Sequence, residues 1–222
     1  MSCPRIVSIL YSTLALVGCS AHQTSGAQPP GQATNAQASP ESMHQAAARA
    51  RLRAVVRDQS FLEHLPQALR ASSLTEPLSG RMMIVYVVDD GGAARHAQES
   101  DLVESGVTRE ALRAVVEWNL GQLLAEPLSC TSHAVSEPAH HNYYESSRLL
   151  LDKQWADLAA RAGTLVVAAP TNDTLFVACN PTPDVLKKLA VVVQNSYPQA
   201  PRPVSSSLLT WVSDGWHELP PP

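Results

Sequence analysis

The side chains best suited to chemistry gather in one short segment and one later position: Tyr144, Glu145, Ser147, Arg148 and Asp173. A serine hydroxyl becomes a nucleophile when a histidine takes its proton and a carboxylate orients that histidine. Ser147, a nearby histidine and Asp173 would supply these groups, which predicts a hydrolase. The serine lies in Glu-Ser-Ser-Arg, however, without the glycines of a G-x-S-x-G turn. The same residues therefore also predict a polar pocket that binds a ligand without catalysis.

Such a pocket would draw on three segments of the chain, with these candidate lining residues: Asn119, Tyr144, Glu145, Ser147, Arg148 and Asp173. Purely structural roles are open for all of them. Glu145 suits the first turn of a helix that Ser147 would help to cap, since carboxylates and hydroxyls stabilise helix N-termini. Arg148 would then pair with Asp173 across the fold, and Asn119 would hydrogen-bond a neighbouring loop.

Four potential metal ligands lie close together in the sequence: His133, Glu137, His140 and His141. Imidazole nitrogens and carboxylates bind zinc, and a catalytic site needs three of them with one position open. The segment has no HExxH motif, and Pro138 disfavours one helix face for all four. We therefore expect a histidine-rich solvated loop and no cofactor, with zinc as the alternative.

Asp89 and Asp90 follow an apolar run and precede Gly91 and Gly92. Carboxylates at the end of a strand can hold a hard cation or position a sugar. A simple turn is the commoner reason for the sequence Asp-Asp-Gly-Gly. The chain has no G-x-G-x-x-G, GKS or GKT sequence, which excludes the common phosphate-binding loops.

Residues 1–18 have the layout of a signal peptide. Arg5 precedes an apolar stretch over residues 6–17 that is too short for a comfortable membrane span. The stretch ends in Leu-Val-Gly-Cys19, which resembles the lipobox of bacterial lipoproteins. This resemblance implies acylation of Cys19, with palmitate-type chains, and Ser20 after it points to the outer membrane of a two-membrane bacterium. An ordinary signal peptide with an accidental cysteine is the alternative.

Cysteine usage fits an exported protein. Cys3 would leave with the signal peptide and Cys19 would carry lipid, so that Cys130 and Cys179 remain. In an oxidising compartment this pair predicts a disulfide, although two buried free thiols stay open as the alternative. The chain has no CxxC motif, so a redox enzyme is not expected.

Residues 19–40 predict a flexible linker after the lipidated cysteine. From residue 21 the segment consists mainly of Gln, Ala, Ser, Thr, Gly and Pro and cannot bury enough surface to fold. Residues 41–222 are then expected to form a single domain. The net charge of −4 argues against nucleic acid as a partner, which leaves the membrane through the anchor and an unknown protein or small molecule.

Alanine-rich residues 42–58 predict a helix, and a second short helix is expected over residues 61–71. On the first helix Arg49, Arg53 and Arg57 would form one stripe, because they are spaced four residues apart. Such a stripe suits an anionic lipid surface or an acidic partner, or is simply a solvated face.

The apolar run at residues 81–90 predicts a central strand, and further strands are expected at 164–169 and 174–178. Helices are expected over residues 108–124, 145–162 and 183–197. A hairpin is expected around Asp214-Gly215, between Trp211 and Trp216. Strands and helices alternate without regular βαβ units, so the predicted fold class is α+β: one mixed, mainly antiparallel sheet covered by helices on one side.

Three segments together resemble the YtpQ-like family of uncharacterised bacterial proteins: "YVVDDGGAARHAQESDLVESGVTREALRAVVEWNL", "YESSRLLLDKQW" and "LVVAAPTNDTLFVA". The matching features include Asn119-Leu120 at a helix end, the Tyr144–Arg148 segment, and Asp173 in a Pro-x-x-Asp turn. The resemblance spans residues 82–219 and implies the fold without implying an activity. The resemblance implies a cytosolic location, as for the family's usual members, so the lipobox and linker depart from the family's pattern.

The leading hypothesis from sequence is a lipid-anchored protein of the bacterial cell envelope that acts by binding. The alternative is an envelope hydrolase that uses the region of Tyr144, Arg148 and Asp173, with or without a metal ion.

Overall fold

The structure is a computed structural model that describes residues 40–138, 142–213 and 215–220. Its helices are α1 (Pro40–Arg51), α2 (Gln59–Glu63), α3 (Gln67–Ser72), α4 (Glu99–Ser105), α5 (Arg109–Leu123), η1 (Glu145–Leu150), α6 (Asp152–Ala162), α7 (Pro183–Ser196) and η2 (Tyr197–Gln199), where η marks a 3₁₀ helix. Its strands are β1 (Leu52–Asp58), β2 (Thr75–Ser79), β3 (Met82–Asp89), β4 (Ala94–His96), β5 (Val135–Ser136), β6 (Leu165–Ala168), β7 (Phe176–Cys179), β8 (Leu209–Val212) and β9 (Gly215–Glu218).

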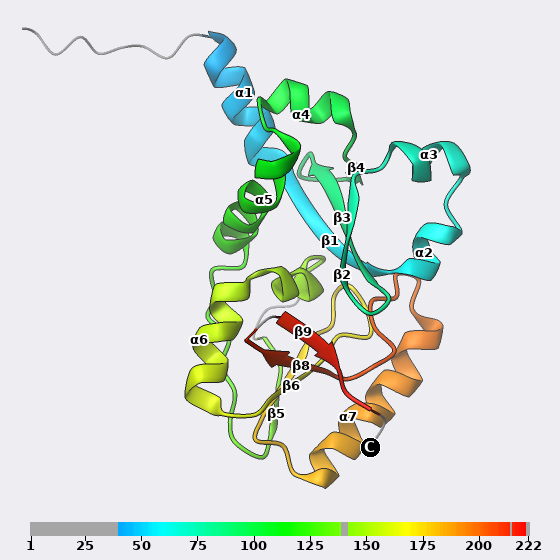
Figure 1. Ribbon diagram of the computed structural model, residues 1–222, viewed down its shortest axis with the longest axis vertical. Helices are drawn as coiled ribbons and strands as arrows, with labels where there is room; N and C mark the ends of the chain where they lie inside the picture. The colour runs from blue at the N-terminus through cyan, green and yellow to red at the C-terminus, as the bar shows by residue number, and fades with distance from the viewer. Residues whose placement is uncertain (1–39, 139–141, 214, 221–222) are drawn as a thin grey trace, which may run out of the picture. The chain divides into compact units, whose positions relative to one another are not determined.

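The strands form two antiparallel sheets (Figure 1). Sheet A has the order β1-β3-β2, and β4 also pairs with β3. Its register places Arg53 opposite Val87 and Arg57 opposite Met83, so the odd-numbered residues of β1 and β3 share one face. Sheet B has the order β5-β7-β6-β8-β9. The α+β class is thus confirmed.

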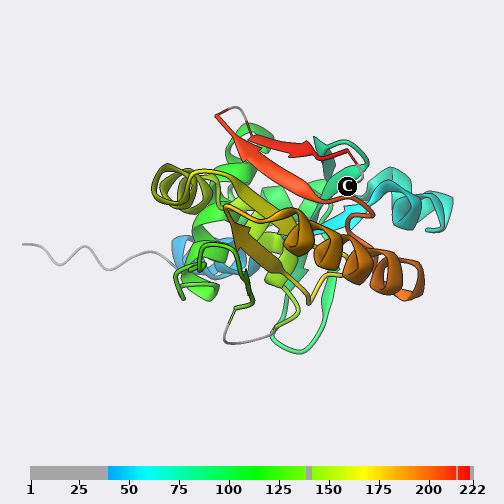
Figure 2. The ribbon, with the colours of Figure 1, turned by 90° about the horizontal axis from the view of Figure 1, so that it is seen from below.

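The prediction of one sheet with helices on one side is wrong. In sheet B, α7 covers one face through Val185, Leu189 and Val193, and Figure 2 shows this helix running across the strands. The opposite face, with Leu165 and Val167, belongs to the main core. Strands β6 and β7 are apolar on both faces, which fits a sheet whose central strands are covered on both sides.

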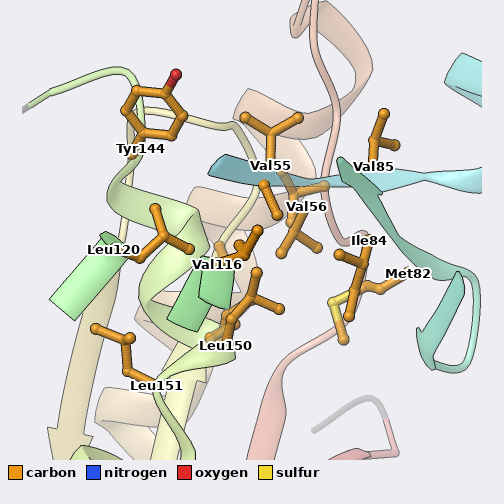
Figure 3. Packing of buried hydrophobic residues seen from close by; sticks show 14 of the residues in the cluster. Val55, Val56, Met82, Ile84, Val85, Val116, Leu120, Tyr144, Leu150 and Leu151 are labelled. Atoms are coloured by element: carbon orange, nitrogen blue, oxygen red, sulfur yellow. The ribbon is translucent and has the colours of Figure 1, made fainter. Parts of the chain in front are cut away.

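The main core lies between sheet A, α5 and the segment of η1 and α6. Figure 3 shows Val56, Val116 and Leu150 meeting in this cluster. Tyr144 lies at its edge, and its hydroxyl points away from the buried side chains. The segment that carries the candidate site residues is thus anchored directly on the core.

The first predicted helix is wrong beyond Arg51. Helix α1 ends there, and β1 pairs with β3 along its whole length. Pairing with a buried strand outweighs the weak helix propensity of an alanine-rich sequence. Asn119 on α5 stabilises this junction, since its amide donates to Arg49 O and Leu52 O, both at 2.9 Å. The proposed arginine stripe does not exist, because Arg53 and Arg57 lie on the strand.

Two other predicted helices are interrupted. The helix expected over residues 61–71 is split into α2 and α3 around Pro66, and the one expected over 145–162 begins as the 3₁₀ helix η1. The structure confirms the remaining expected elements: the central strand β3, the helix α5, the strands β6 and β7, and the helix α7. Thr108 caps α5. The tail hairpin is confirmed as β8 and β9, with Trp211 paired to Trp216.

Cys130 and Cys179 are joined by a disulfide, with Cα atoms 5.9 Å apart. The bond ties the irregular segment after α5 to strand β7. Of the two alternatives left by the sequence, the structure shows the bonded one. None of the helices in the described ranges is long and apolar enough to span a bilayer.

Candidate functional site

Two open hollows lie side by side, one at the turn between β6 and β7 and the other at the turn between β3 and β4, with volumes of about 490 Å³ and 560 Å³. The first is lined by Asn142, Tyr143, Asn172, Asp173, Thr174 and Arg202. The second is lined by Asp89, Gly91, Gly92, Ala93, Ala94, Tyr143, Tyr144 and Arg202. Tyr143 and Arg202 belong to both hollows, and we call these two residues the ridge. The two hollows and the ridge together form the candidate site.

Backbone contacts to the turn between β6 and β7 hold Tyr143 in place. The side-chain amide of Asn172 donates to Tyr143 O at 3.1 Å, and Ser146 N donates to Asn172 O at 3.0 Å. Asn172 is buried although it lines the first hollow, and its side-chain amide is used to hold Tyr143. The Asn-Asp turn predicted from the sequence thus serves to position the ridge.

Arg202 is exposed, but the chain beside it is fixed on both sides. Pro203 O accepts from Asp58 N at the end of β1, at 2.8 Å, and Val204 N donates to Pro170 O at 3.1 Å. Pro203 also forms an isolated bridge with Thr171. These contacts bring a segment from near the C-terminus against the first strand and place the guanidinium over Tyr143.

The ridge covers a buried arginine. Arg57 on β1 is only 1% exposed. Its Nη2 donates to Tyr143 Oη at 3.0 Å and its Nη1 donates to Val56 O at 2.8 Å. Its guanidinium carbon lies 5.5 Å from the ring centroid of Phe61 and 5.7 Å from that of Tyr143. Burial lowers the pKa of Arg57, as does the nearby positive charge of Arg202.

Arg202 stacks on the same tyrosine from the hollow, with its guanidinium carbon 4.9 Å from the ring centroid. Two cations therefore share one aromatic ring. Among the described residues, no carboxylate lies within ion-pair distance of either arginine. Buried arginines usually have an anionic partner, because an unpaired charge is costly to desolvate. The missing counter-charge is the most unusual electrostatic feature of the site.

Each hollow holds one carboxylate that is already hydrogen-bonded. In the first hollow, Asp173 accepts from the hydroxyls of Thr171 at 2.5 Å and Thr174 at 3.3 Å. The Thr171 bond is the main cause that lowers the pKa of Asp173, and the Arg202 charge contributes. Asp173 keeps free lone pairs because a carboxylate accepts about four hydrogen bonds.

In the second hollow, Asp89 accepts from Tyr144 Oη at 2.8 Å and from Gly91 N at 2.9 Å. Burial and this hydrogen bond raise the pKa of Tyr144, so the phenol stays protonated and donates to Asp89. Asp90, the second aspartate of the motif, pairs with Arg51 at 2.7 Å and lies outside both hollows. The Gly91 contact is that of a simple turn.

Ser147 and its neighbours are structural. Ser147 is fully buried, and its Oγ has no hydrogen-bond partner among the described residues, so no base is placed to activate it. Arg148 pairs with Glu145 at 2.9 Å rather than with Asp173, which corrects the expected ion pair. Arg148 also donates to Leu124 O and Glu126 O, at 3.1 and 2.8 Å. The buried pair thus fastens η1 to the end of α5.

Of the six residues predicted to line one pocket, only Tyr144 and Asp173 line the candidate site, and they lie in different hollows. Asn119 stabilises the α1–β1 junction.

Of the predicted metal ligands, His133 contacts Asn180 O through Nδ1 at 2.7 Å, and Glu137 lies beside a smaller hollow next to Arg148. His140 and His141 lie outside the described residues, as does Cys19. Within the described ranges, no three His, Cys, Asp or Glu side chains lie close enough together to hold a metal ion.

The sequence did not single out Tyr143 or Arg202, and it placed Arg57 on a helix. The three residues come from distant segments, so no local spacing connects them. Two weak signals existed: Arg57 is flanked by a strand-like Val-Val pair, and Arg202 lies between two prolines that restrict its backbone.

No family model, curated protein or solved structure matches this chain.

Proposed function

We propose that this chain is a lipid-anchored protein of the bacterial cell envelope whose folded domain binds a polar ligand in the candidate site around Tyr143 and Arg202. The observation that carries the proposal is the ridge. Both of its residues line both hollows, and no carboxylate of the described residues pairs with its arginine. Volumes of several hundred cubic ångströms lie in the range of small-molecule sites.

Binding is favoured over hydrolysis by the positions of the candidate catalytic groups. A hydrolase that used Ser147 would need an exposed hydroxyl beside a base, whereas this side chain is fully buried. The other two residues of that hypothesis, buried Tyr144 and exposed Asp173, lie in different hollows and already have hydrogen-bond partners. We therefore do not extend the proposal to hydrolysis.

The anchor is proposed at Cys19, after cleavage of residues 1–18, with residues 19–40 as the linker and the outer membrane as the location. The lipobox-like sequence supports this assignment. The bond between Cys130 and Cys179 supports it independently, since disulfides persist in oxidising compartments such as the periplasm. Membership of residues 82–219 in the YtpQ-like family is part of the same proposal and adds no activity to it.

Native mass spectrometry of the full-length protein, extracted from its own membrane in mild detergent, tests both parts. We expect a chain that begins at Cys19 with added acyl chains and that retains a non-covalent small molecule. The retained mass should be lost in an Arg202→Gln variant and kept in Arg161→Gln, an exposed arginine on α6 that lines neither hollow. A chain that still begins at Met1 contradicts the anchor. A retained mass that both variants keep equally contradicts the proposed site.

A further inference from the structure

The ridge presents donors that only an acceptor-rich ligand can satisfy. Arginine has no acceptor atom, so Tyr143 Oη must accept the bond from Arg57, and its own proton remains available. A guanidinium stacked on a ring keeps its in-plane N–H groups free at the edge. Arg202 and Tyr143 therefore offer several N–H and O–H donors in one place, between the two hollows.

The charge at the ridge matches a dianion better than a monoanion. Arg57 and Arg202 carry two positive charges, and among the described residues neither has a carboxylate within ion-pair distance. Asp173 is the acidic group that interacts with Arg202, and it uses the hydroxyls of Thr171 and Thr174 as partners. A phosphate monoester carries about −1.5 to −2 at pH 7 and offers three acceptor oxygens. A single carboxylate would need one guanidinium only.

The hollows on either side of the ridge suit hydroxyl groups. Asp173 lies in one hollow and Asp89 in the other, and each oxygen pair has lone pairs left to accept hydrogen bonds. Both carboxylates would repel a second phosphate but accept bonds from sugar or polyol hydroxyls. The combined space, about 490 and 560 Å³, is ample for such a molecule.

We propose that the ridge of Tyr143 and Arg202 binds the phosphate group of a phosphorylated sugar or polyol, with buried Arg57 adding positive charge beneath it and the two hollows receiving hydroxyl groups. The inference rests on the proposed binding function and adds the ligand class. The phosphate group reaches the site either on a soluble molecule or on the headgroup of a lipid.

Isothermal titration calorimetry on the full-length protein in non-ionic detergent tests the ligand class. The probes are glucose 6-phosphate, inorganic phosphate and glucose. We expect glucose 6-phosphate to bind with a Kd on the order of 1 mM or tighter and to exceed both other probes. Arg202→Gln should weaken it about tenfold or more, and Tyr143→Phe, which keeps the ring and loses the donor, about fivefold. Arg161→Gln should leave it unchanged.

Equal binding of glucose and glucose 6-phosphate overturns the inference, as does an unchanged affinity in Arg202→Gln. If native mass spectrometry shows a retained ligand without phosphate, the proposed binding function stands and this inference fails. Adding phosphatidic acid to the micelles distinguishes the two sources. A lipid-borne phosphate should compete with glucose 6-phosphate for the ridge, whereas a site for soluble ligands should show the same affinity with and without the lipid.

Discussion

Removal of the disulfide is expected to cost a large part of the stability of the domain. Cys130 and Cys179 are 49 positions apart, and the loop between them contains η1, α6 and β6. Closing a loop of this length in the unfolded chain is worth about 4 kcal/mol at 25 °C. The folded state should be otherwise preserved, because β5 still pairs with β7 and His133 N still donates to Cys179 O.

The assay is thermal and urea unfolding of the Cys130→Ala/Cys179→Ala variant, followed by tryptophan fluorescence. Trp155 and Trp216 are buried against each other and report loss of the core. For a domain of this size, 4 kcal/mol corresponds to a fall in Tm of about 10 °C. The wild type treated with dithiothreitol is the control and should fall by a similar amount. A loss below about 1 kcal/mol with an unchanged urea m-value would refute the reasoning, since the bond would then not constrain the unfolded chain.

Two further predictions concern ion pairs with a buried carboxylate. Arg148→Met should destabilise the fold by about 3–5 kcal/mol in urea unfolding, because Glu145 stays buried without its partner. Adding Glu145→Gln should recover part of that loss, and no recovery would show that the two side chains do not act as a pair. Hydrogen bonds from Arg95 lower the pKa of Asp101 in the folded state. The stability that Asp101 contributes is therefore fully present above its pKa in the unfolded chain, about 3.9, and is lost as the pH falls through its lower pKa in the folded state. Asp101→Asn should accordingly make the free energy of unfolding less dependent on pH in acid.

Helix caps and turn sequences are local signals, and they correctly predict the helices α5 and α7 and the C-terminal hairpin. Thr108 caps α5 and Thr182 caps α7, and in both cases the side chain accepts from a backbone N–H of the first turn. The hairpin of Trp211 and Trp216 follows from its turn sequence and alternating pattern. These features need no knowledge of distant residues.

The errors occurred where distant contacts decide the local structure. Residues after Arg51 become a strand because β3 lies beside them, although their composition also suits a helix. Ser147 lies in a motif of polar residues, yet η1 is buried. Arg148 pairs there with Glu145 and donates to the carbonyl groups of Leu124 and Glu126. The polar residues 145–148 predict an exposed site, but in the structure they belong to the interior.

Most of the candidate site could not be predicted from the sequence, because contacts between distant segments form it. Tyr143 is ordered by Asn172, and Arg202 by the contacts of Pro203 with Asp58. Neither position carries a recognisable motif, and the positive charge of Arg57 matters only because the fold buries it beneath Tyr143.

The bond from Asp58 N to Pro203 O also has a consequence for how the chain folds. It joins the first strand to a segment near the C-terminus, so the entropy of closing nearly the whole domain must be overcome before it forms. The placement of Arg57 and Arg202 against the same Tyr143 ring should accordingly be among the last events in folding. A molecule bound there would hold together the first strand and a segment from the last part of the chain, so its binding energy would add to the global stability of the domain rather than to one loop.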